Sequence, residues 1–592
     1  MLSDITYIFK YREKVVDRVM LYVSLVCALV VLFHLGYNME AHTAALFAVV
    51  IKWLFYGLFI LGALRIGFSI LAVRKVGVAH YGGLVLSLYF LTVIVGRLSG
   101  EPHLAFLQNN EWLYLGIFAV ALTELSKSSL FFDTFYFNPT ILFVISFLVL
   151  ILVGTLLLML PRTTAGVPLS FVDALFMATS AVCITGLATV DIAAQFTQFG
   201  HTVILVLIQL GGLGIMTFTG FFGYFFSGGF SYKNQLMYSE FLGQNKVASV
   251  INTLLKIIFI TLFFELVGAV FIFFSIDATH FETYGDRMFF AVFHAVSAFC
   301  NAGFTTAPGG LSQVAFRFNY EMQLVLSLLF ILGGLGFGIV FNTYTFIKRW
   351  VINIFLRIFH GRPYTYRAWV ISFNTRLIMW ITLILVVLST VATFVLEYNH
   401  SLAGHSTLWG KWVAAFFTGN SARSTGFNVA EASGFSLPML ATAVFLMWVG
   451  SSPGSTGGGI KTTTFAVALL NIVSLAKGKD NLEIFGREIS NDSISKAFAI
   501  IMLSFLAVGM TILGLTITDS HLGLLPIAFE SFSAYATCGL SLGITPELSA
   551  AGKVIIIFSM FVGRVGLLTL LVALIKNTKN RSYEYPQEKI LF

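Results

Sequence analysis

The sequence predicts an all-α membrane protein in which four related helical units follow four extra N-terminal transmembrane helices. Two observations carry this prediction. The chain of 592 residues is 58% hydrophobic and only 10% charged, whereas soluble domains carry about a quarter charged residues. In addition, four short glycine-bearing segments share one pattern and recur about every 113 to 123 residues, which indicates four copies of one unit.

Apolar runs long enough to cross a bilayer as helices recur along the chain. Clear examples are 20–35, 44–68, 140–160, 377–395 and 554–574. The first 17 residues carry Lys10, Arg12 and Lys14 without a small-residue cleavage pattern, so we expect no removable signal peptide.

The extension occupies residues 1–136, with helices expected at 19–37, 44–70, 81–98 and 112–131. The four units are expected at 137–232, 233–350, 351–478 and 479–592, the last ending in a short cytoplasmic tail. Each unit reads as a long helix, a short apolar segment that ends in a glycine loop, and a second long helix. The first helices are expected near 138–160, 247–275, 373–397 and 494–517, and the second near 201–226, 320–349, 436–474 and 552–576.

The short segments, such as 172–182 and 287–299, are too short to cross a bilayer and are typical of re-entrant half-helices. Non-helical backbone at membrane depth persists only where it is buried in protein or lines a wet cavity. Four re-entrant loops therefore predict a shared aqueous centre.

The repeated pattern is aligned on four glycines, Gly186, Gly303, Gly426 and Gly539. A phenylalanine stands ten residues earlier, at Phe176, Phe293, Phe416 and Phe529. A small polar residue stands six residues earlier, at Ser180, Ser297, Asn420 and Ser533, and is expected to hold the end of the half-helix.

Glycine adopts positive φ without steric cost, so four such loops can turn successive backbone carbonyls into one lumen. Carbonyl oxygens can replace the water shell of an ion, as in a selectivity filter, and the C-terminal ends of the half-helices add partial negative charge. The alternative is that the glycines serve only close helix packing. The predicted filter residues are Cys183, Ile184, Thr185, Gly186, Cys300, Asn301, Ala302, Gly303, Arg423, Ser424, Thr425, Gly426, Ala536, Thr537, Cys538 and Gly539.

The chain resembles the Trk/Ktr/HKT superfamily of potassium transporters over residues 137–592. The strings that carry the resemblance are TSAVCITGLATVD, HAVSAFCNAGFTT, GNSARSTGFN, SAYATCGLSLGITP, SSPGSTGGGIKTTTF and GRVGLLTL. The resemblance implies four M1–P–M2 pore repeats in a pseudo-four-fold arrangement around one pore. It also implies potassium as the ion held by backbone carbonyls. In that family, a serine at the first filter position accompanies sodium preference and glycine at all four positions accompanies potassium, and all four are glycine here.

The second helix of the third unit is interrupted by a run with five glycines and Pro453, which cannot stay helical. One interpretation is a kink at a packing crossover. The resemblance implies instead an intramembrane gating loop under the filter. The predicted gate residues are Gly450, Ser455, Thr456, Gly457, Gly458, Gly459, Lys461 and Arg564.

Two arginines lie close to these loops. Arg564 falls within an apolar span, where an arginine normally faces a partner or a water-filled path. The resemblance places it under the filter, where it would slow cations, and a salt bridge within the bundle is the alternative. Arg423 is expected to brace its loop through hydrogen bonds rather than touch the ion.

Two further polar residues stand on the half-helices. His294 is expected to be a packed polar residue, and Glu530 to raise the local cation concentration.

Basic residues gather in the connections after the second helices. They are Lys233, Lys246, Lys348, Arg349, Arg357, Arg362, Arg367, Lys477, Lys479, Arg487, Lys576, Lys579 and Arg581. The positive-inside rule therefore places both termini in the cytoplasm, in a multi-pass chain of the cytoplasmic membrane, and the glycine loops near the outer face. The net charge of +8 is read as a topology signal, and we expect no nucleic-acid partner. Phosphate binding by these loops is the alternative.

The four cysteines form no CxxC pair, and three stand within three residues of a signature glycine. We interpret these as small side chains packed behind the loops rather than as a redox or zinc site.

We expect no enzymatic activity and no organic cofactor, because no Walker loop, zinc signature or nucleophile elbow occurs. Partners expected from the resemblance are a second copy in a homodimer, membrane lipid, and a separate cytosolic nucleotide-binding regulatory subunit, since no nucleotide-binding unit follows residue 576. A sodium or mixed transporter of the same fold and a non-transporting membrane sensor are the alternatives. The extension is expected to be a scaffold, with a sensing module as the alternative.

Overall fold

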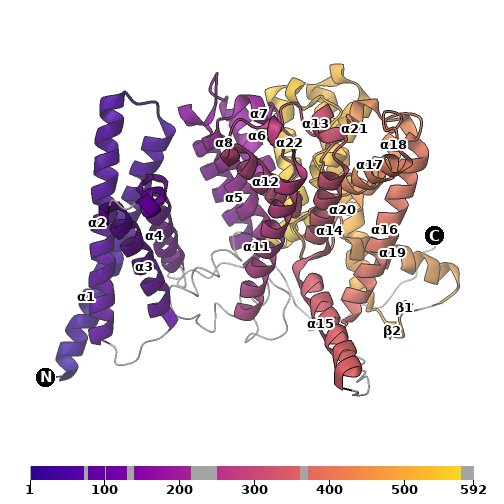
Figure 1. Ribbon diagram of the computed structural model, residues 1–592. Helices are drawn as coiled ribbons and strands as arrows, with labels where there is room; N and C mark the ends of the chain where they lie inside the picture. Colours follow the sequence, from indigo (N-terminus) through magenta and orange to yellow (C-terminus); the bar gives the residue numbers. More distant parts are fainter. Residues whose placement is uncertain are drawn as a thin grey trace.

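The computed structural model describes residues 2–72, 78–99, 102–129, 139–214, 250–360, 371–479 and 481–574. Helices make up almost all of its regular structure (Figure 1). Within these ranges the only strands are β1 (Glu483–Ile484) and β2 (Arg487–Glu488), which form one short antiparallel pair. The predicted all-α class is confirmed.

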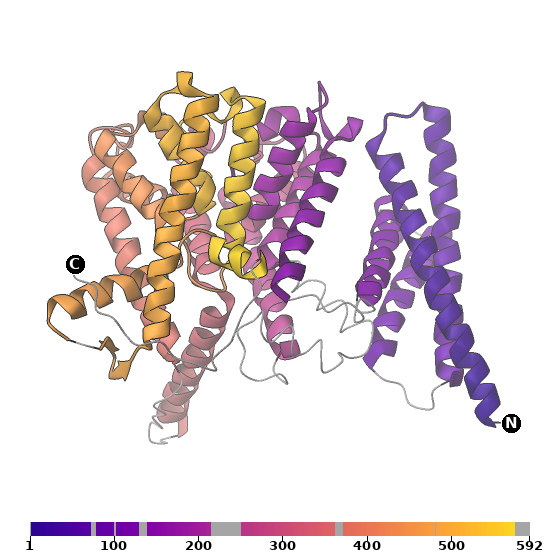
Figure 2. The same cartoon turned by 180° about the vertical axis from the view of Figure 1, so that it is seen from behind.

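The N-terminal extension forms a bundle that stands to one side of the other helices in both views (Figures 1 and 2). Its elements are α1 (Leu2–Gly36), α2 (Ala41–Ala72), α3 (Val78–Ser99), the short 3-10 helix η1 (Pro102–Gln108) and α4 (Glu111–Ser129). Arg65 on α2 pairs with Asp17 and Glu124, at 2.8 Å each, so charges on three helices compensate one another as intramembrane charges must. The four expected helices are present, and α1 begins well before residue 19.

The rest of the chain repeats the expected order of a long helix, a short helix and a second helix. The long helices are α5 (Pro139–Leu158), α11 (Val250–Ser275), α16 (Phe373–Glu397) and α20 (Asn491–Thr518). The short helices are α6 (Phe171–Cys183), α12 (Tyr284–Phe299), α17 (Leu408–Ser421) and α21 (Leu524–Ala536). The second helices are α8 (Gln198–Leu213), α14 (Tyr320–Leu335), α18 (Leu437–Trp448) and α22 (Ala550–Val565).

Three more helices continue the second helices, and short turns join the elements. The continuing helices are α15 (Phe337–His360), α19 (Thr462–Ala476) and α23 (Leu567–Leu574). The short turns are η3 (Pro161–Thr163), α7 (Ile192–Gln195), η5 (Ala278–His280), α13 (Val314–Arg317), η6 (Ala432–Gly434), η7 (Ser520–Leu522) and η8 (Thr545–Glu547).

Five helices in the described part are long and apolar enough to cross a membrane, and a bent pair brings the number to six. The single spans are Val15–Gly36, Ala41–Phe68, Thr253–Ser275, Phe373–Glu397 and Asn491–Thr518. Several shorter apolar helices, including α6 and α8, accompany them. The chain is a polytopic membrane protein.

Two second helices differ from the expected unbroken rods. The bent pair is α14 and α15, which meet at 105° across Gly336, and α22 gives way to α23 at Gly566. Both glycines have positive φ, 89° and 87°, a conformation that a right-handed helix cannot continue. The expected single helices at 320–349 and 552–576 were therefore wrong, whereas the interruption of the third unit, between α18 and α19, is present.

The units close into a ring through their short helices. The second helix of each unit packs against the short helix of the next: α8 against α12, α14 against α17, α18 against α21, and α22 back against α6. This circular packing brings the C-terminal ends of the four short helices together.

Many of the basic residues used to predict orientation lie outside the described part of the chain. These are Lys233, Lys246, Arg362, Arg367, Lys576, Lys579 and Arg581. Lys348, Arg349 and Arg357 lie on α15, which projects away from the body of the molecule (Figure 1).

Candidate ion-conduction site

The four glycine loops begin where the short helices end. In three of them the residue two positions before the glycine has positive φ: Ile184 (59°), Asn301 (61°) and Thr537 (49°). The glycines that follow also have positive φ, at 88°, 71°, 74° and 91° for Gly186, Gly303, Gly426 and Gly539. Left-handed backbone is costly for a β-branched residue and persists only where the surroundings enforce it, so the first and fourth loops, which place Ile184 and Thr537 there, are held tightly.

The four glycines form a closed ring. Each lies so near the residue that directly precedes the glycine of an adjacent unit that an added Cβ would overlap the carbonyl oxygen of that residue. The pairs are Gly186 with Ala302, Gly303 with Thr425, Gly426 with Cys538, and Gly539 with Thr185. The sequence of contacts runs through all four units and returns to the first, so backbone carbonyls from all four loops gather around one centre.

A serine on each short helix fastens its loop. Ser180 accepts from the amide of Gly186 (3.1 Å) and donates to the carbonyl oxygen of Leu187 (2.6 Å). Ser297 donates to the Phe304 carbonyl (2.8 Å), and Ser533 accepts from the Gly539 amide (3.1 Å). The expected role of these three serines is confirmed.

The third unit departs from the predicted alignment by one residue. Ser421, not Asn420, donates to the carbonyl oxygen of Phe427 at 2.6 Å, and Phe417 rather than Phe416 is fully buried like the phenylalanines of the other units. Asn420 instead bonds the hydroxyls of Ser389 and Thr390 on α16, at 3.1 Å each. The third loop is therefore one residue shorter between its serine and its glycine.

A second repeated motif holds the short helices in place, and sequence analysis missed it. Gly211, Gly333 and Gly563 stand three residues before a glycine of positive φ in the first, second and fourth units. A Cβ at any of them would overlap a backbone carbonyl near the end of the short helix, that of Val182, Phe299 or Tyr535. The repeated strings GGLG at 211–214, GGLG at 333–336 and GRVG at 563–566 could have revealed this motif.

The cysteines near the loops are packed as expected. Cys183, Cys300 and Cys538 are free and fully buried. The thiol of Cys538 lies 3.2 Å from the carbonyl oxygen of Ala422 in the third unit. The loop residues Thr185, Ala302 and Thr425, which directly precede three of the glycines, are also fully buried.

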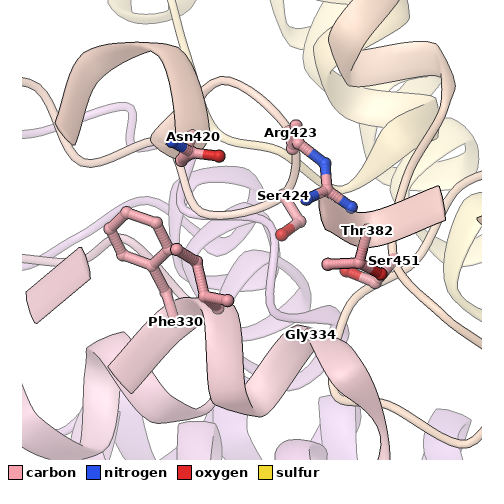
Figure 3. A pocket seen from close by; sticks show the side chains of 8 residues that line it. Phe330, Gly334, Thr382, Asn420, Arg423, Ser424 and Ser451 are labelled. Atoms are coloured by element: carbon pink, nitrogen blue, oxygen red, sulfur yellow. The ribbon is translucent and has the colours of Figure 1, made fainter. Parts of the chain in front are cut away.

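Arg423 is buried beside a small pocket behind the third loop. Its side chain extends toward Thr382 and Ser451, with Asn420 and Phe330 across the pocket (Figure 3). Its Nε has no hydrogen-bond partner within the described residues. The expected bracing of the loop is therefore not made by this atom.

The run from Gly450 to Gly459 forms a loop that contacts the other units. The amide of Ser452 donates to the carbonyl oxygen of Gly334 (3.0 Å), and the amide of Gly458 donates to Oγ1 of Thr537 (3.0 Å). Ser455 turns back onto the carbonyl oxygen of Ser452 within the loop (2.5 Å). The loop therefore contacts the second helix of the second unit at Gly334 and the end of the short helix of the fourth unit at Thr537.

Asn301 connects the second glycine loop to this run. Its side-chain amide lies 2.9 Å from Oγ1 of Thr425 and 2.7 Å from Oγ1 of Thr456. In the orientation that satisfies both amide atoms, the nitrogen donates to Thr425 and the oxygen accepts from Thr456. One side chain thus joins the glycine loops of two units to the middle of the interrupted helix.

Two cations flank the same run. Lys461 donates to the carbonyl oxygen of Gly457 (2.7 Å). Arg564 donates through Nη1 to the carbonyl oxygen of Thr456 and through Nη2 to that of Gly211 (2.7 Å). Within the described residues Arg564 forms no salt bridge, so the alternative of an ion pair in the bundle is not seen there.

The side chains of His294 and Glu530, on the short helices of the second and fourth units, are fully buried. His294 bonds the hydroxyl of Thr305 (2.8 Å) as a packed polar residue, as expected. Glu530 bonds the hydroxyls of Ser541 and Thr545, so its carboxylate faces side chains of its own loop.

Comparison with known proteins identifies relatives that share this architecture. The TrkH family, described as cation transport proteins, matches residues 115–585. The Ktr system potassium uptake protein B of Bacillus subtilis is 37% identical over 456 residues, which are 77% of this chain and 96% of the relative. The potassium/sodium uptake protein NtpJ of Enterococcus hirae is 32% identical over 77% of this chain and 97% of its own length.

A crystal structure of the potassium transporter TrkH from Vibrio parahaemolyticus has the same fold. It aligns with a TM-score of 0.57 at 18% identity and covers 84% of this chain and 98% of its own. The family match spans most of the chain and includes all four glycine loops. This chain belongs to the TrkH family of cation transport proteins.

Proposed function

We propose that this chain is the pore-forming subunit of a potassium uptake system of the cytoplasmic membrane. The closed ring of four glycines and facing carbonyls is the observation that carries the proposal. A potassium ion that leaves water loses a hydration energy on the order of tens of kcal/mol, and carbonyl oxygens can replace it without a full charge that would trap the ion. Relatives named as potassium uptake proteins support the choice of ion.

Ions enter from the outer face and pass the ring toward the cytoplasm. The C-terminal ends of the four short helices direct partial negative charge at the ring. An inside-negative potential contributes about 2.3 kcal/mol per charge per 100 mV to inward movement. In this arrangement both termini lie in the cytoplasm.

The run from Gly450 to Gly459 is the gate in this proposal. Its support is the set of hydrogen bonds to Asn301, Thr537 and Arg564, which reach the second and fourth units. Opening the path requires these bonds to break, so their combined free energy opposes opening.

A mixed potassium and sodium transporter is the second candidate, because one relative is named as a potassium/sodium uptake protein. Glycine at all four filter positions favours potassium. Gly186→Ser with rubidium and sodium uptake measured side by side decides between them. An unchanged preference would count against the filter assignment.

The chain is further proposed to work as a homodimer with a separate cytosolic nucleotide-binding subunit. The word "system" in the names of the Ktr relatives supports a multi-component assembly. The mass of the detergent-purified complex tests the dimer. Full regulated activity of the chain purified without any such subunit would count against the second part.

Growth of a potassium-uptake-deficient bacterium at limiting potassium tests the whole proposal. The wild-type chain is expected to restore growth, and Gly303→Asp is expected to abolish it, because the new side chain would occupy the ring. Rubidium influx into liposomes provides the direct measurement. A non-transporting membrane sensor predicts no influx from either protein.

A further inference from the structure

Glu530 and His294 occupy equivalent positions on the short helices of the fourth and second units. Each stands three residues before the serine that fastens its loop, Ser533 or Ser297. Both side chains are completely buried. Each bonds a hydroxyl two residues beyond the ring glycine, on Ser541 or Thr305.

The hydrogen-bond direction at His294 follows from its partners. Nδ1 lies 2.8 Å from the carbonyl oxygen of Phe290, which can only accept, so Nδ1 carries the proton. Nε2, 2.8 Å from Oγ1 of Thr305, therefore accepts from that hydroxyl. The same Oγ1 accepts from the amide of Ala307 at 3.0 Å, so His294 fixes the chain just beyond Gly303.

Glu530 makes the equivalent arrangement in the fourth unit. Its Oε1 accepts from the hydroxyl of Ser541 and from that of Thr545 at 2.9 Å. Oγ of Ser541 in turn accepts from the amide of Gly543 at 2.9 Å. A buried acceptor thus holds the segment that follows Gly539.

The first and third units lack this acceptor pair. Met177 and Thr418 fill the equivalent helix positions, three residues before Ser180 and Ser421. The residues two beyond their glycines are Ala188, which has no polar side-chain atom, and Asn428, whose amide bonds its own loop at Ala430. Loops whose following segment is held by a buried acceptor, in the second and fourth units, therefore alternate around the ring with loops that lack this acceptor, in the first and third units. We call the former braced and the latter unbraced.

We propose that Glu530 and His294 are positioning residues that set ion selectivity by fixing the outer ends of the fourth and second filter loops. This inference rests on the proposed function of the ring. A loop held from behind by a directed hydrogen bond keeps its carbonyls at the spacing that suits potassium. A loop released from its brace can close around the smaller sodium ion, so selectivity falls while the path stays open.

The test uses the full chain in liposomes of phosphatidylethanolamine and phosphatidylglycerol, with rubidium and sodium influx measured in parallel. Glu530→Leu and His294→Leu remove the acceptor and are expected to lower the rubidium-to-sodium ratio about tenfold, equivalent to ~1.4 kcal/mol. Glu530→Gln and His294→Gln keep an acceptor atom and are expected to retain the wild-type ratio. Met177→Leu, at the equivalent position of an unbraced unit, is the matched control and is expected to leave the ratio unchanged.

Several results would overturn the inference. A Glu530→Gln variant as unselective as Glu530→Leu would show that the charge matters and not the hydrogen bond. Leucine variants with lower total influx at an unchanged ratio would show a merely structural role. If the leucine variants do not fold, Thr305→Val removes only the bonded hydroxyl, and an unchanged ratio in that variant would also overturn it. Absence of rubidium influx in the wild type would instead reject the proposed function.

Discussion

The guanidinium of Arg564 on α22 donates to the carbonyl oxygen of Thr456, so the fourth unit holds the middle of a loop that belongs to the third. Its other terminal nitrogen donates to Gly211 of the first unit at 2.7 Å. One side chain of the fourth unit therefore links the third unit to the first. The consequences of removing it, and of changing the ring itself, can be measured.

Arg564→Ala is expected to increase rubidium influx about tenfold. The substitution removes a buried cation and two charge-assisted hydrogen bonds, each worth ~1.5–3 kcal/mol. The bond to Thr456 holds the loop, and the bond to Gly211 links the same side chain to α8. Influx into liposomes at equal protein content is the measurement. Lys496→Met is the control, because Lys496 pairs with Asp492 at an exposed site on α20. Unchanged or slower influx in Arg564→Ala would contradict a gating role for the loop.

Gly303→Ala is expected to abolish uptake. Its φ of 71° disfavours any side chain, and the new Cβ would overlap the carbonyl oxygen of Thr425. Gly434→Ala is the matched control, since nothing lies within 4 Å of a Cβ at that position. Growth at limiting potassium and rubidium influx report the difference. Normal uptake by Gly303→Ala would mean that the ring is not the ion path.

Ser421→Ala is expected to lower both thermal stability and rubidium selectivity. Loss of the 2.6 Å bond leaves the buried carbonyl of Phe427 unsatisfied, at a cost of ~1–3 kcal/mol. Asn420→Ala breaks bonds to α16 and to the carbonyl oxygen of Phe416 on its own helix, but none to the glycine loop, so it is expected to lower stability without changing selectivity. Unfolding temperature and the rubidium-to-sodium influx ratio are measured for both. The reverse result would restore the alignment on Asn420.

Asp173→Asn is expected to destabilise the protein at neutral pH and to have less effect as the pH falls. Asp173, in the first turn of α6, contacts Lys553 at 2.7 Å. Burial by itself raises the pKa of this carboxyl, but the hydrogen bonds from Lys553 and Ser170 and the Lys553 charge lower it overall. Because the folded-state pKa lies below the unfolded value, the stabilisation is present above the unfolded pKa and is lost as pH falls through the folded pKa.

Unfolding temperatures of both proteins across a pH series provide the test of the Asp173 prediction. Asp492→Asn is the control, because the exposed pair of Asp492 and Lys496 contributes little. A difference between wild type and Asp173→Asn that stays constant from neutral to acid pH would contradict the assigned role of the carboxylate.

Most elements of the fold were predictable because their signals are local. Apolar runs of sufficient length give membrane helices wherever they occur, and short apolar segments that end in glycine gave the four short helices. The breaks at Gly336 and Gly566 were not predicted, because the hydropathy of α14 and α22 continues past them. Only the conformation of each glycine, decided by its neighbours in space, ends these helices.

The sequence identified most residues of the site, but fewer of the hydrogen bonds that join them. The glycines, Ser180, Ser297 and Ser533 were identified by position, and the structure places them as expected. Asn420 was assigned in place of Ser421 because a fixed spacing hid a loop one residue shorter. The amide of Asn301 between two units could not be anticipated, since its partners lie more than a hundred residues away.

The sequence by itself determined that this is a helical membrane protein with four glycine loops, because hydrophobicity and the freedom of glycine act within a few neighbouring residues. The sequence also predicted that the loops share one centre, but only the tertiary structure decided which carbonyl each glycine meets, that Arg564 reaches Thr456, and that Glu530 and His294 hold the segments beyond alternate loops. These relationships depend on packing between segments distant in the chain. Such packing is set by the shape of the whole assembly of helices, and no local pattern encodes it.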